Sequence, residues 1–469
     1  MRKILLAASL LFLGSTSRAQ WLPQNAGFSN DTLGFYELSL PDKYTAWAVC
    51  YDGKNGLLSG RPVLDFTRTT NGGNTWIPGK MGTDRTLRFS NISAIDGQEA
   101  WVAMNKIGPA PGTFGKGGGV FHTTDAGVTW EHTEPGELFD TGSVPRFVHF
   151  KDKNKGIAVG DPKGGYFEVY TTMNMGKKWK RVDATDLPAP LPNEIGWISG
   201  YAVVGNTIWF GTSRGRMYKS TDFGKNWTVH VVDSIPGTYV QEIAFLDDGL
   251  TGVAHLRGRS RTFVFSTTDG GLTWTNYFQP PNWKNSRMTA VPGTNAFVST
   301  AVHPNPIFQG SAVSYDAGRT WTEIDNQASK AVCRFFDAET GYAGSFYVTN
   351  PFRGGIFKSQ IVFQQPAATE SARSSKRRAA APKNAAASVA VHVYPTPARD
   401  VVNLVFGGVP AGKEGVASIH SLDGRQLLSA RLSGASTVQL NVSGLPAGLY
   451  TLRIATKAGT KSQVITLAK

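Results

Sequence analysis

The sequence has few of the residues that build metal sites or disulfide scaffolds. Its 469 residues include two cysteines, Cys50 and Cys333. Two cysteines allow one disulfide but not a disulfide-stabilised fold. The cysteines do not have the spacing of metal ligands, and the eight histidines show no HExxH pattern. We therefore expect no metal ion and no cofactor, and whether the two cysteines pair stays open.

Long apolar segments are also missing. No apolar run reaches the ~18 residues that cross a membrane, and no long stretch shows helical periodicity. The chain is instead rich in Gly (53), Phe (26) and Trp (12). This composition is typical of many short strands joined by tight turns. It favours an all-β protein without a transmembrane segment.

The N-terminus reads as a signal peptide. Arg2 and Lys3 precede the apolar stretch 4–13, and Ser17 and Ala19 provide small residues for cleavage. We predict a signal peptide over 1–19 and a mature chain that begins at Gln20.

The formal net charge is +14, and part of the excess lies in one segment, 361–390. This segment is rich in Ala, Ser and Pro and carries Arg373, Lys376, Arg377, Arg378 and Lys383. It cannot bury enough apolar surface to order itself. We interpret it as a disordered linker rather than a nucleic-acid-binding patch, because no nucleic-acid-binding fold accompanies it.

An octapeptide, Ser/Thr-x-Asp/Asn-x-Gly-x-x-Trp, recurs six times. Its tryptophans are 54, 49, 48, 47 and 47 residues apart, a period that suits one four-stranded propeller blade. The Asp or Asn side chain can bond nearby backbone N–H groups, and the Trp can cover apolar surface between sheets. The six pairs are Asn71 and Trp76, Asp125 and Trp130, Asn174 and Trp179, Asp222 and Trp227, Asp269 and Trp274, and Asp316 and Trp321.

These octapeptides resemble the Asp-box, or bacterial neuraminidase repeat. Proteins with this repeat include sialidases, some glucanases, sortilin-type receptors and photosystem II assembly-factor propellers. The resemblance implies a β-propeller and a structural role for the boxes, but not a particular activity.

Seven strand pairs predict seven blades, with six as the fallback. Their second strands lie near Ala46, Trp101, Ile157, Ile208, Gly252, Ala296 and Tyr342. The seventh unit has no box. Trp21-Leu22-Pro23-Gln24 resembles Trp76-Ile77-Pro78-Gly79, so we expect the mature N-terminus to supply the outer strand of blade seven. The predicted propeller spans 20–360.

Residues 391–469 return to strands and turns and predict a small Ig-like β-sandwich. Separated motifs recur along this segment: Tyr394, Pro395, Pro397, Ala398, Asp400, Asp423-Gly424-Arg425, Gly448-Leu449-Tyr450 and Lys469. On these residues the segment resembles the type A sorting domain of the type IX secretion system, apart from Thr396, where Asn is usual. The resemblance implies export by that machinery, a secreted or cell-surface protein, and a source of the Bacteroidetes type.

Candidate ligand-binding residues lie where innermost strands are expected to begin. Blade alignment places four arginines there, with Trp197 and Glu242 in blades four and five: Arg88, Arg146, Arg287 and Arg334. Such a ring could bind an anionic group through paired N–H donors. Alternatively, each arginine pairs with a neighbouring carboxylate such as Glu137, Asp140 or Glu194. Both interpretations stay open.

The sequence also contains candidate catalytic residues. Tyr170 with Glu168 could form a sialidase-like pair, and a two-carboxylate glycosidase could use Asp161, Glu168, Glu194 or Glu242. The chain departs from sialidases in two ways. Gly60-Arg61-Pro62-Val63 stands where they have an Arg-Ile-Pro signature, and the predicted seven blades exceed their six.

In blade count the chain most resembles the photosystem assembly-factor group, which acts by binding partners. We therefore favour a monomeric, secreted or cell-surface module that binds a glycan or protein. A glycoside hydrolase acting on extracellular polysaccharide is the alternative.

Overall fold

The computed structural model describes residues 20–29, 32–52, 63–84, 86–108, 114–133, 138–139, 143–259, 261–303, 305–345 and 355–363, and, towards the C-terminus, 390–394, 400–407, 414–421, 425–433, 437–456 and 459–467. The chain divides into two compact units, Met1–Ala368 and Thr369–Lys469. The predicted signal peptide and most of the predicted linker lie outside the described residues.

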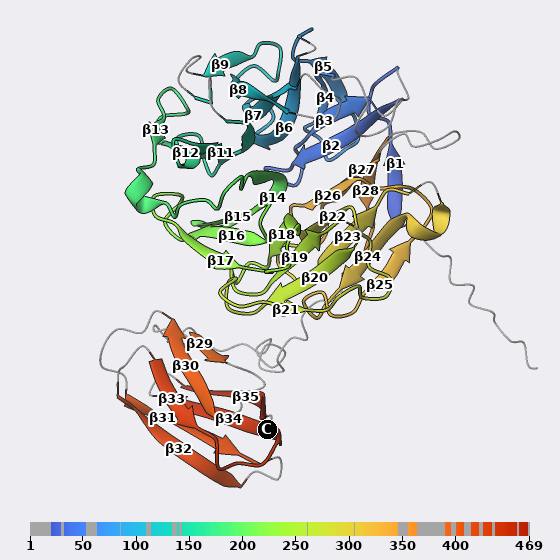
Figure 1. Ribbon diagram of the computed structural model, residues 1–469. Helices are drawn as coiled ribbons and strands as arrows, with labels where there is room; N and C mark the ends of the chain where they lie inside the picture. The colour runs from blue at the N-terminus through green and yellow to red at the C-terminus, as the bar shows by residue number, and fades with distance from the viewer. Residues whose placement is uncertain are drawn as a thin grey trace, which may run out of the picture. The chain divides into compact units, whose positions relative to one another are not determined.

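The first unit is a ring of seven four-stranded antiparallel sheets (Figure 1). Blades one to three consist of β2–β5 (Leu33–Ser39, Ala46–Asp52, Asp65–Thr69, Ile77–Lys80), β6–β9 (Leu87–Ala94, Ala100–Ile107, Phe114–Thr123, Glu131–Thr133) and β10–β13 (Pro145–Phe150, Gly156–Lys163, Tyr166–Thr172, Lys180–Arg181). Blades four to six consist of β14–β17 (Gly196–Val204, Thr207–Thr212, Arg216–Ser220, Thr228–Val231), β18–β21 (Tyr239–Phe245, Gly252–Arg257, Thr262–Thr267, Thr275–Asn276) and β22–β25 (Arg287–Ala290, Phe297–Ala301, Gly310–Ser314, Thr322–Asp325). The prediction of seven blades is confirmed.

Blade seven joins the two ends of the ring. It contains β26 (Val332–Phe335), β27 (Gly341–Ser345) and β28 (Gly355–Ser359), and its outer strand is β1 (Trp21–Gln24). Trp21 pairs with Ser359 and Gln24 with Ile356, which confirms the predicted closure (Figure 1). The box is missing from this blade because the chain is interrupted between its third and fourth strands, where the other blades carry the box.

Packing of this blade continues past the predicted boundary at residue 360. Ile361 and Phe363 are buried against a cluster that includes Trp21 and Phe335. The propeller therefore extends to at least Phe363, because these apolar side chains cover the closing blade.

Each box folds in the same way. In the second box, Asp125 Oδ1 accepts the backbone N–H of Thr129 at 2.9 Å, and Thr123 Oγ1 accepts that of Gly127 at 2.9 Å. Gly127 has a φ of +85°, and Ala126 before it also has a positive φ, +65°. The other five boxes repeat both hydrogen bonds. The predicted turn function of the boxes is confirmed.

A second aspartate turn, which the sequence analysis missed, joins the first and second strands of five blades. In each, one carboxylate oxygen accepts the backbone N–H groups two and three residues later, at 2.6–2.9 Å. The aspartates are Asp42, Asp96, Asp152, Asp248 and Asp337. These turns lie at the same end of the blades as the boxes, because both follow strands that run in the same direction.

The propeller core lies between neighbouring blades. Trp101 in β7 stacks on Phe150 in β10 with ring centroids 3.6 Å apart, and Trp209 in β15 stacks on Phe245 in β18 at 3.9 Å. Trp130 of the second box packs edge-on against Phe66 of blade one at 5.9 Å. These large rings join each blade to the next and fix the innermost strands around the channel.

The second unit contains a three-stranded and a four-stranded sheet. They are β29 (Ala390–Tyr394), β30 (Val401–Gly407) and β33 (Thr437–Asn441), and β31 (Glu414–His420), β32 (Gln426–Ser433), β34 (Gly448–Thr456) and β35 (Gly459–Leu467). One buried cluster, including Leu404 and Leu452, joins the two sheets. Tyr450 Oη donates to Pro446 O at 2.8 Å. Pro395, Pro397 and Lys469 of the predicted sorting motif lie outside the described residues.

Cys50 and Cys333 are both buried and both free thiols. They belong to two different apolar clusters, so the disulfide considered from the sequence is not formed. Among the described residues, no helix is long and apolar enough to cross a membrane.

Candidate functional site

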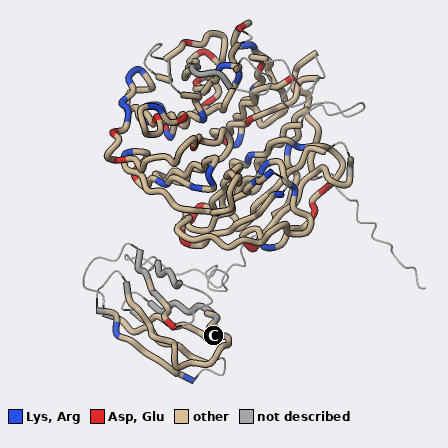
Figure 2. The backbone as a smooth tube through the Cα atoms, in the orientation of Figure 1, with Lys and Arg blue, Asp and Glu red and all other residues tan. Residues whose placement is uncertain are grey.

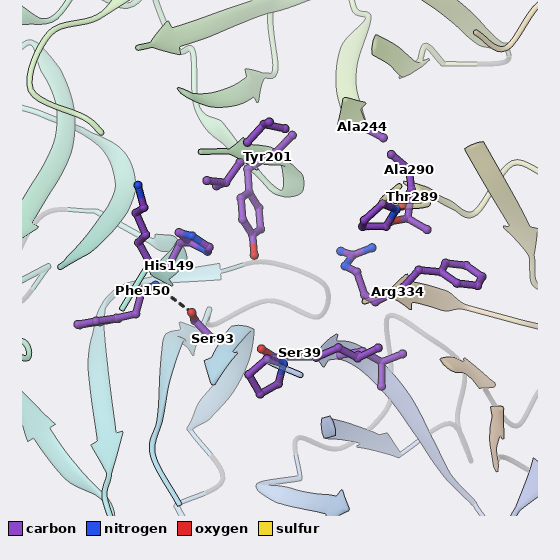
Figure 3. Close-up of a pocket in the computed structure, with 18 of the residues that line it drawn as sticks. Ser39, Ser93, His149, Phe150, Tyr201, Ala244, Thr289, Ala290 and Arg334 are labelled. Carbon is purple, nitrogen blue, oxygen red and sulfur yellow. Dashed lines mark hydrogen bonds between the residues drawn. The ribbon is translucent and has the colours of Figure 1, made fainter. Parts of the chain in front are cut away.

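A cavity of about 620 Å³ opens at one end of the propeller channel. All seven innermost strands line it, from Ser39 in β2 and Ser93 in β6 to Arg334 in β26 (Figure 3). Pro41, Asp152 and Pro292, from turns between first and second strands, also line it. The cavity therefore lies at the end that carries the Asp boxes, whereas the sequence analysis expected binding at the opposite end.

Two residues that line the cavity, Glu242 and Arg334, belong to a cluster of four charged side chains. Arg334 lies 2.7 Å from Glu37 and 3.8 Å from Glu242, measured between guanidinium nitrogen and carboxylate oxygen. Arg287 lies 3.3 Å from Glu242 and 3.6 Å from Glu37. These side chains come from blades one, five, six and seven. We call Glu37, Glu242, Arg287 and Arg334 the charge quartet.

The two carboxylates of the quartet share the same two arginines. Burial raises the pKa of Glu242 to about 7, although Arg287 and Arg334 oppose the shift, and the charge of Glu37 adds to it. Burial would lower the pKa of Arg334, but Glu37 and Glu242 raise it overall, so this guanidinium stays charged. Near neutral pH the quartet can therefore carry either no net charge or one positive charge.

Hydroxyl groups also line the cavity. Tyr201 Oη accepts a hydrogen bond from Asn91 Nδ2 at 3.0 Å, and burial raises the pKa of Tyr201 to about 12. Ser39 Oγ accepts the N–H of Ala94, and Ser93 Oγ accepts the N–H of Phe150, both at 2.9 Å. The Tyr201 hydroxyl and the Arg334 guanidinium point toward the middle of the cavity (Figure 3).

The four arginines predicted as a ring do not share one depth. Arg88, Arg146 and Arg287 lie at the first or second residue of β6, β10 and β22, as predicted. Arg334 is the third of four residues in β26, so its predicted position at the start of the strand is wrong. It lines the cavity, and its guanidinium shares the carboxylates Glu37 and Glu242 with Arg287.

Internal carboxylates hold three of these arginines. Arg146 is buried and makes two hydrogen bonds to Asp161, at 2.8 and 2.5 Å. Arg287 and Arg334 belong to the charge quartet. Arg88 is partly buried near Tyr36. The pairing partners are Asp161, Glu37 and Glu242 rather than the carboxylates expected from the sequence, of which Glu137 and Asp140 lie outside the described residues.

The candidate catalytic carboxylates are not brought together as one site. Glu168 Oε1 accepts a hydrogen bond from Tyr170 Oη at 2.8 Å, within blade three. Glu194 pairs with Arg216 and accepts a hydrogen bond from Thr212 at 2.5 Å. Asp161 pairs with Arg146. Of the four carboxylates, Glu242 lines the cavity.

Trp197 lies near the start of β14, away from this cavity. Its ring stacks on Tyr239 of blade five with centroids 4.1 Å apart. Two residues of this region were not predicted from the sequence: Glu37, which pairs with Arg334, and Tyr201, which lines the cavity. A charged residue within the apolar strand 33–39 was the available signal for Glu37, because an unpaired buried charge is too costly to keep.

The geometry defines a seven-bladed propeller with a polar cavity at one channel mouth, followed by a separate β domain. Comparison with known families agrees. Residues 112–256 match the family model described as photosynthesis system II assembly factor YCF48. Residues 392–467 match the model described as secretion system C-terminal sorting domain.

A curated relative is the photosystem II stability/assembly factor HCF136, chloroplastic, of Oryza sativa subsp. japonica, 27% identical over 150 residues. The match spans 31% of this chain and 31% of the relative, so the chain matches about a third of that protein's length.

Two solved structures are also similar. "YCF48 bound to D1 peptide" is 17% identical with a TM-score of 0.47, covering 72% of this chain and 96% of that one. A Trypanosoma rangeli sialidase is 12% identical with a TM-score of 0.40, covering 93% and 83%. Neither similarity identifies a ligand of this chain.

The chain is therefore a YCF48-like β-propeller followed by a type IX secretion C-terminal sorting domain. The sorting domain indicates secretion or display at the cell surface through that system.

Proposed function

We propose that the propeller is a binding module that the sorting domain carries out of the cell, where it binds a glycan or protein partner. The observation that carries the proposal is the cavity at the channel mouth. Its volume, about 620 Å³, falls in the range of small-molecule sites, and both apolar side chains and convergent polar groups line it.

The state of the candidate acids supports binding over catalysis. Asp161, Glu168 and Glu194 are each held by a neighbouring Arg or Tyr within the propeller wall. Carboxylates fixed in this way stabilise structure, and a hydrolase needs two of them facing one substrate bond.

A screen of the chain from residue 20 to residue 469 tests this proposal. The purified protein would be applied to an array of bacterial and host glycans and, in parallel, used to capture surface proteins from its own cells. We expect the protein to bind one partner saturably. Adding the same partner free in solution should displace the bound one. A screen without any such partner contradicts the proposal.

A glycoside hydrolase is the second candidate, and one observation favours it. Glu242 lines the cavity, and its pKa of about 7 would let it hold a proton at neutral pH, as a general acid must. Release of reducing ends from polysaccharides by the wild type, with loss of at least a hundredfold in Glu242→Gln, would establish this function. Equal release by both proteins would exclude Glu242 as the acid.

The route of export has its own test. Removing residues 391–469 should leave a folded propeller in the periplasm, because the type IX machinery would lack its signal. Immunoblots of periplasm, cell surface and medium measure this. Truncated protein at the surface would show that the tail is not the export signal.

A further inference from the structure

The cavity contains hydrogen-bond donors that the propeller does not use. Tyr201, Ser39 and Ser93 each accept a hydrogen bond, from Asn91 or from a backbone N–H of the next blade. A hydroxyl that accepts in this way keeps its own proton to donate. Three hydroxyl donors, on blades four, one and two, therefore line one space (Figure 3).

Arg334 adds further donors. Its Nη1 donates to Cys333 O at 3.0 Å, and its Nη2 contacts Glu37. A guanidinium has five N–H groups, so these contacts do not exhaust it. The side chain keeps 22% of its surface exposed, whereas Glu37 and Glu242 keep 1% and 2%. Of the quartet, Arg334 is therefore the most exposed to the cavity, whereas Glu242 lines it while almost fully buried and Glu37 does not line it.

The acidic residues of the cavity wall are already satisfied. Asp152 accepts the N–H groups of Asn154 and Lys155, and Asp247 accepts that of Gly293 at 2.7 Å. Lys151, at the exposed rim, contacts the neutral amide of Asn206 at 2.8 Å and so keeps its positive charge uncompensated there. Acidic and basic residues are otherwise interspersed around the propeller (Figure 2).

From this arrangement we infer that the cavity at the Asp-box end of the channel binds a single carboxylate group, held by Arg334, Tyr201 and the serine hydroxyls. This inference rests on the proposed binding function and names the chemistry of the ligand. A planar carboxylate accepts two parallel N–H bonds from a guanidinium. A doubly charged phosphate fits less well, because the buried Glu37 and Glu242 already offset the two quartet arginines.

An acidic sugar and a peptide C-terminus both present such a carboxylate, and paired probes distinguish them. NMR or calorimetric titration of the 20–469 chain would compare galacturonate with galactose, and a free-acid tripeptide with its amide. We expect the charged member of one pair to bind and its neutral partner not to bind. Equal affinity within both pairs, or no binding of any probe, overturns the inference. A partner found by the glycan and protein screen would in that case still support the proposed function.

Matched variants locate the site. Tyr201→Phe should weaken binding about tenfold, the effect of removing one hydrogen bond to a charged group. Tyr239→Phe, at the other end of the channel, should change nothing. Lys151→Ala should weaken binding severalfold, and less at high salt, whereas the exposed Lys177→Ala in the same blade should not. Unchanged affinity in both cavity variants overturns the inference.

A pH profile provides an independent readout. Glu242 faces Arg287 and Arg334, with Glu37, Tyr201 and Cys333 nearby. Its ionisation adds a negative charge behind the ligand, so carboxylate affinity should rise as pH falls from 8 to 6. Glu242→Gln should remove this rise. A pH-independent affinity in the wild type contradicts the arrangement.

Discussion

Closure of the ring by β1 predicts a large effect from one side chain of that strand. Trp21 is 5% exposed, packs 6.0 Å from Phe335, and donates from Nε1 to Ser311 Oγ at 2.9 Å. Replacing a buried tryptophan by alanine costs about 3–5 kcal/mol, because it removes apolar contact and leaves a cavity. For a propeller of this size, the melting temperature should fall on the order of 5–10 °C.

Tryptophan fluorescence measures this change in the propeller alone, since all 12 tryptophans lie between Trp21 and Trp321. Leu22→Ala is the matched control. Leu22 is the next residue of β1 and is 39% exposed, so its loss should shift the midpoint much less. Equal midpoints for Trp21→Ala and wild type would refute the view that β1 stabilises the closed ring.

Three further predictions follow from particular residues. Gly127→Ala should destabilise the propeller by about 1–2 kcal/mol or more, because the φ of Gly127 is +85° and an added Cβ would overlap the Phe66 ring. Ala126→Gly should be nearly neutral, and chemical denaturation compares the two variants. Because the pKa of Glu242 is raised to about 7 in the folded state, the native state binds the proton more tightly than the unfolded state. The free energy of unfolding should therefore fall as pH rises from about 4.5 to 7. A flat profile in the wild type, or the same slope in Glu242→Gln, would contradict this. Cys50 and Cys333 should titrate as two thiols in denatured, unreduced protein, and fewer than two would reveal a disulfide. In native protein both thiols should react slowly, because burial raises the pKa of both.

Local repeats made most of the fold predictable from the sequence. The box encodes its own turn through Asp125 and its equivalents, and the Trp21-Leu22-Pro23-Gln24 pattern correctly identified the closing strand. The second aspartate turn was also readable, since Asp96 and its equivalents precede the second strand at a nearly constant distance. This turn has no tryptophan, so the octapeptide pattern does not include it.

The site was less predictable because it depends on ring closure. Glu37 on blade one meets Arg334 on blade seven because the last blade returns to the first. Arg334 was aligned by sequence with arginines at the start of their strands, whereas it is the third residue of β26. Tyr201 gave no signal, because an aromatic residue in a propeller strand is usually part of the core.

The central claim, that the partner binds in the channel mouth, is tested most directly by filling that cavity. Ala290 lines the cavity on β22, and Ala184 is an exposed residue of the 3-10 turn Ala184–Asp186. The measurement is the dissociation constant of the screened partner for wild type, Ala290→Phe and Ala184→Phe, with melting temperatures as a check on folding. The account predicts at least tenfold weaker binding by a folded Ala290→Phe and wild-type binding by Ala184→Phe. Wild-type affinity in a folded Ala290→Phe protein would contradict it.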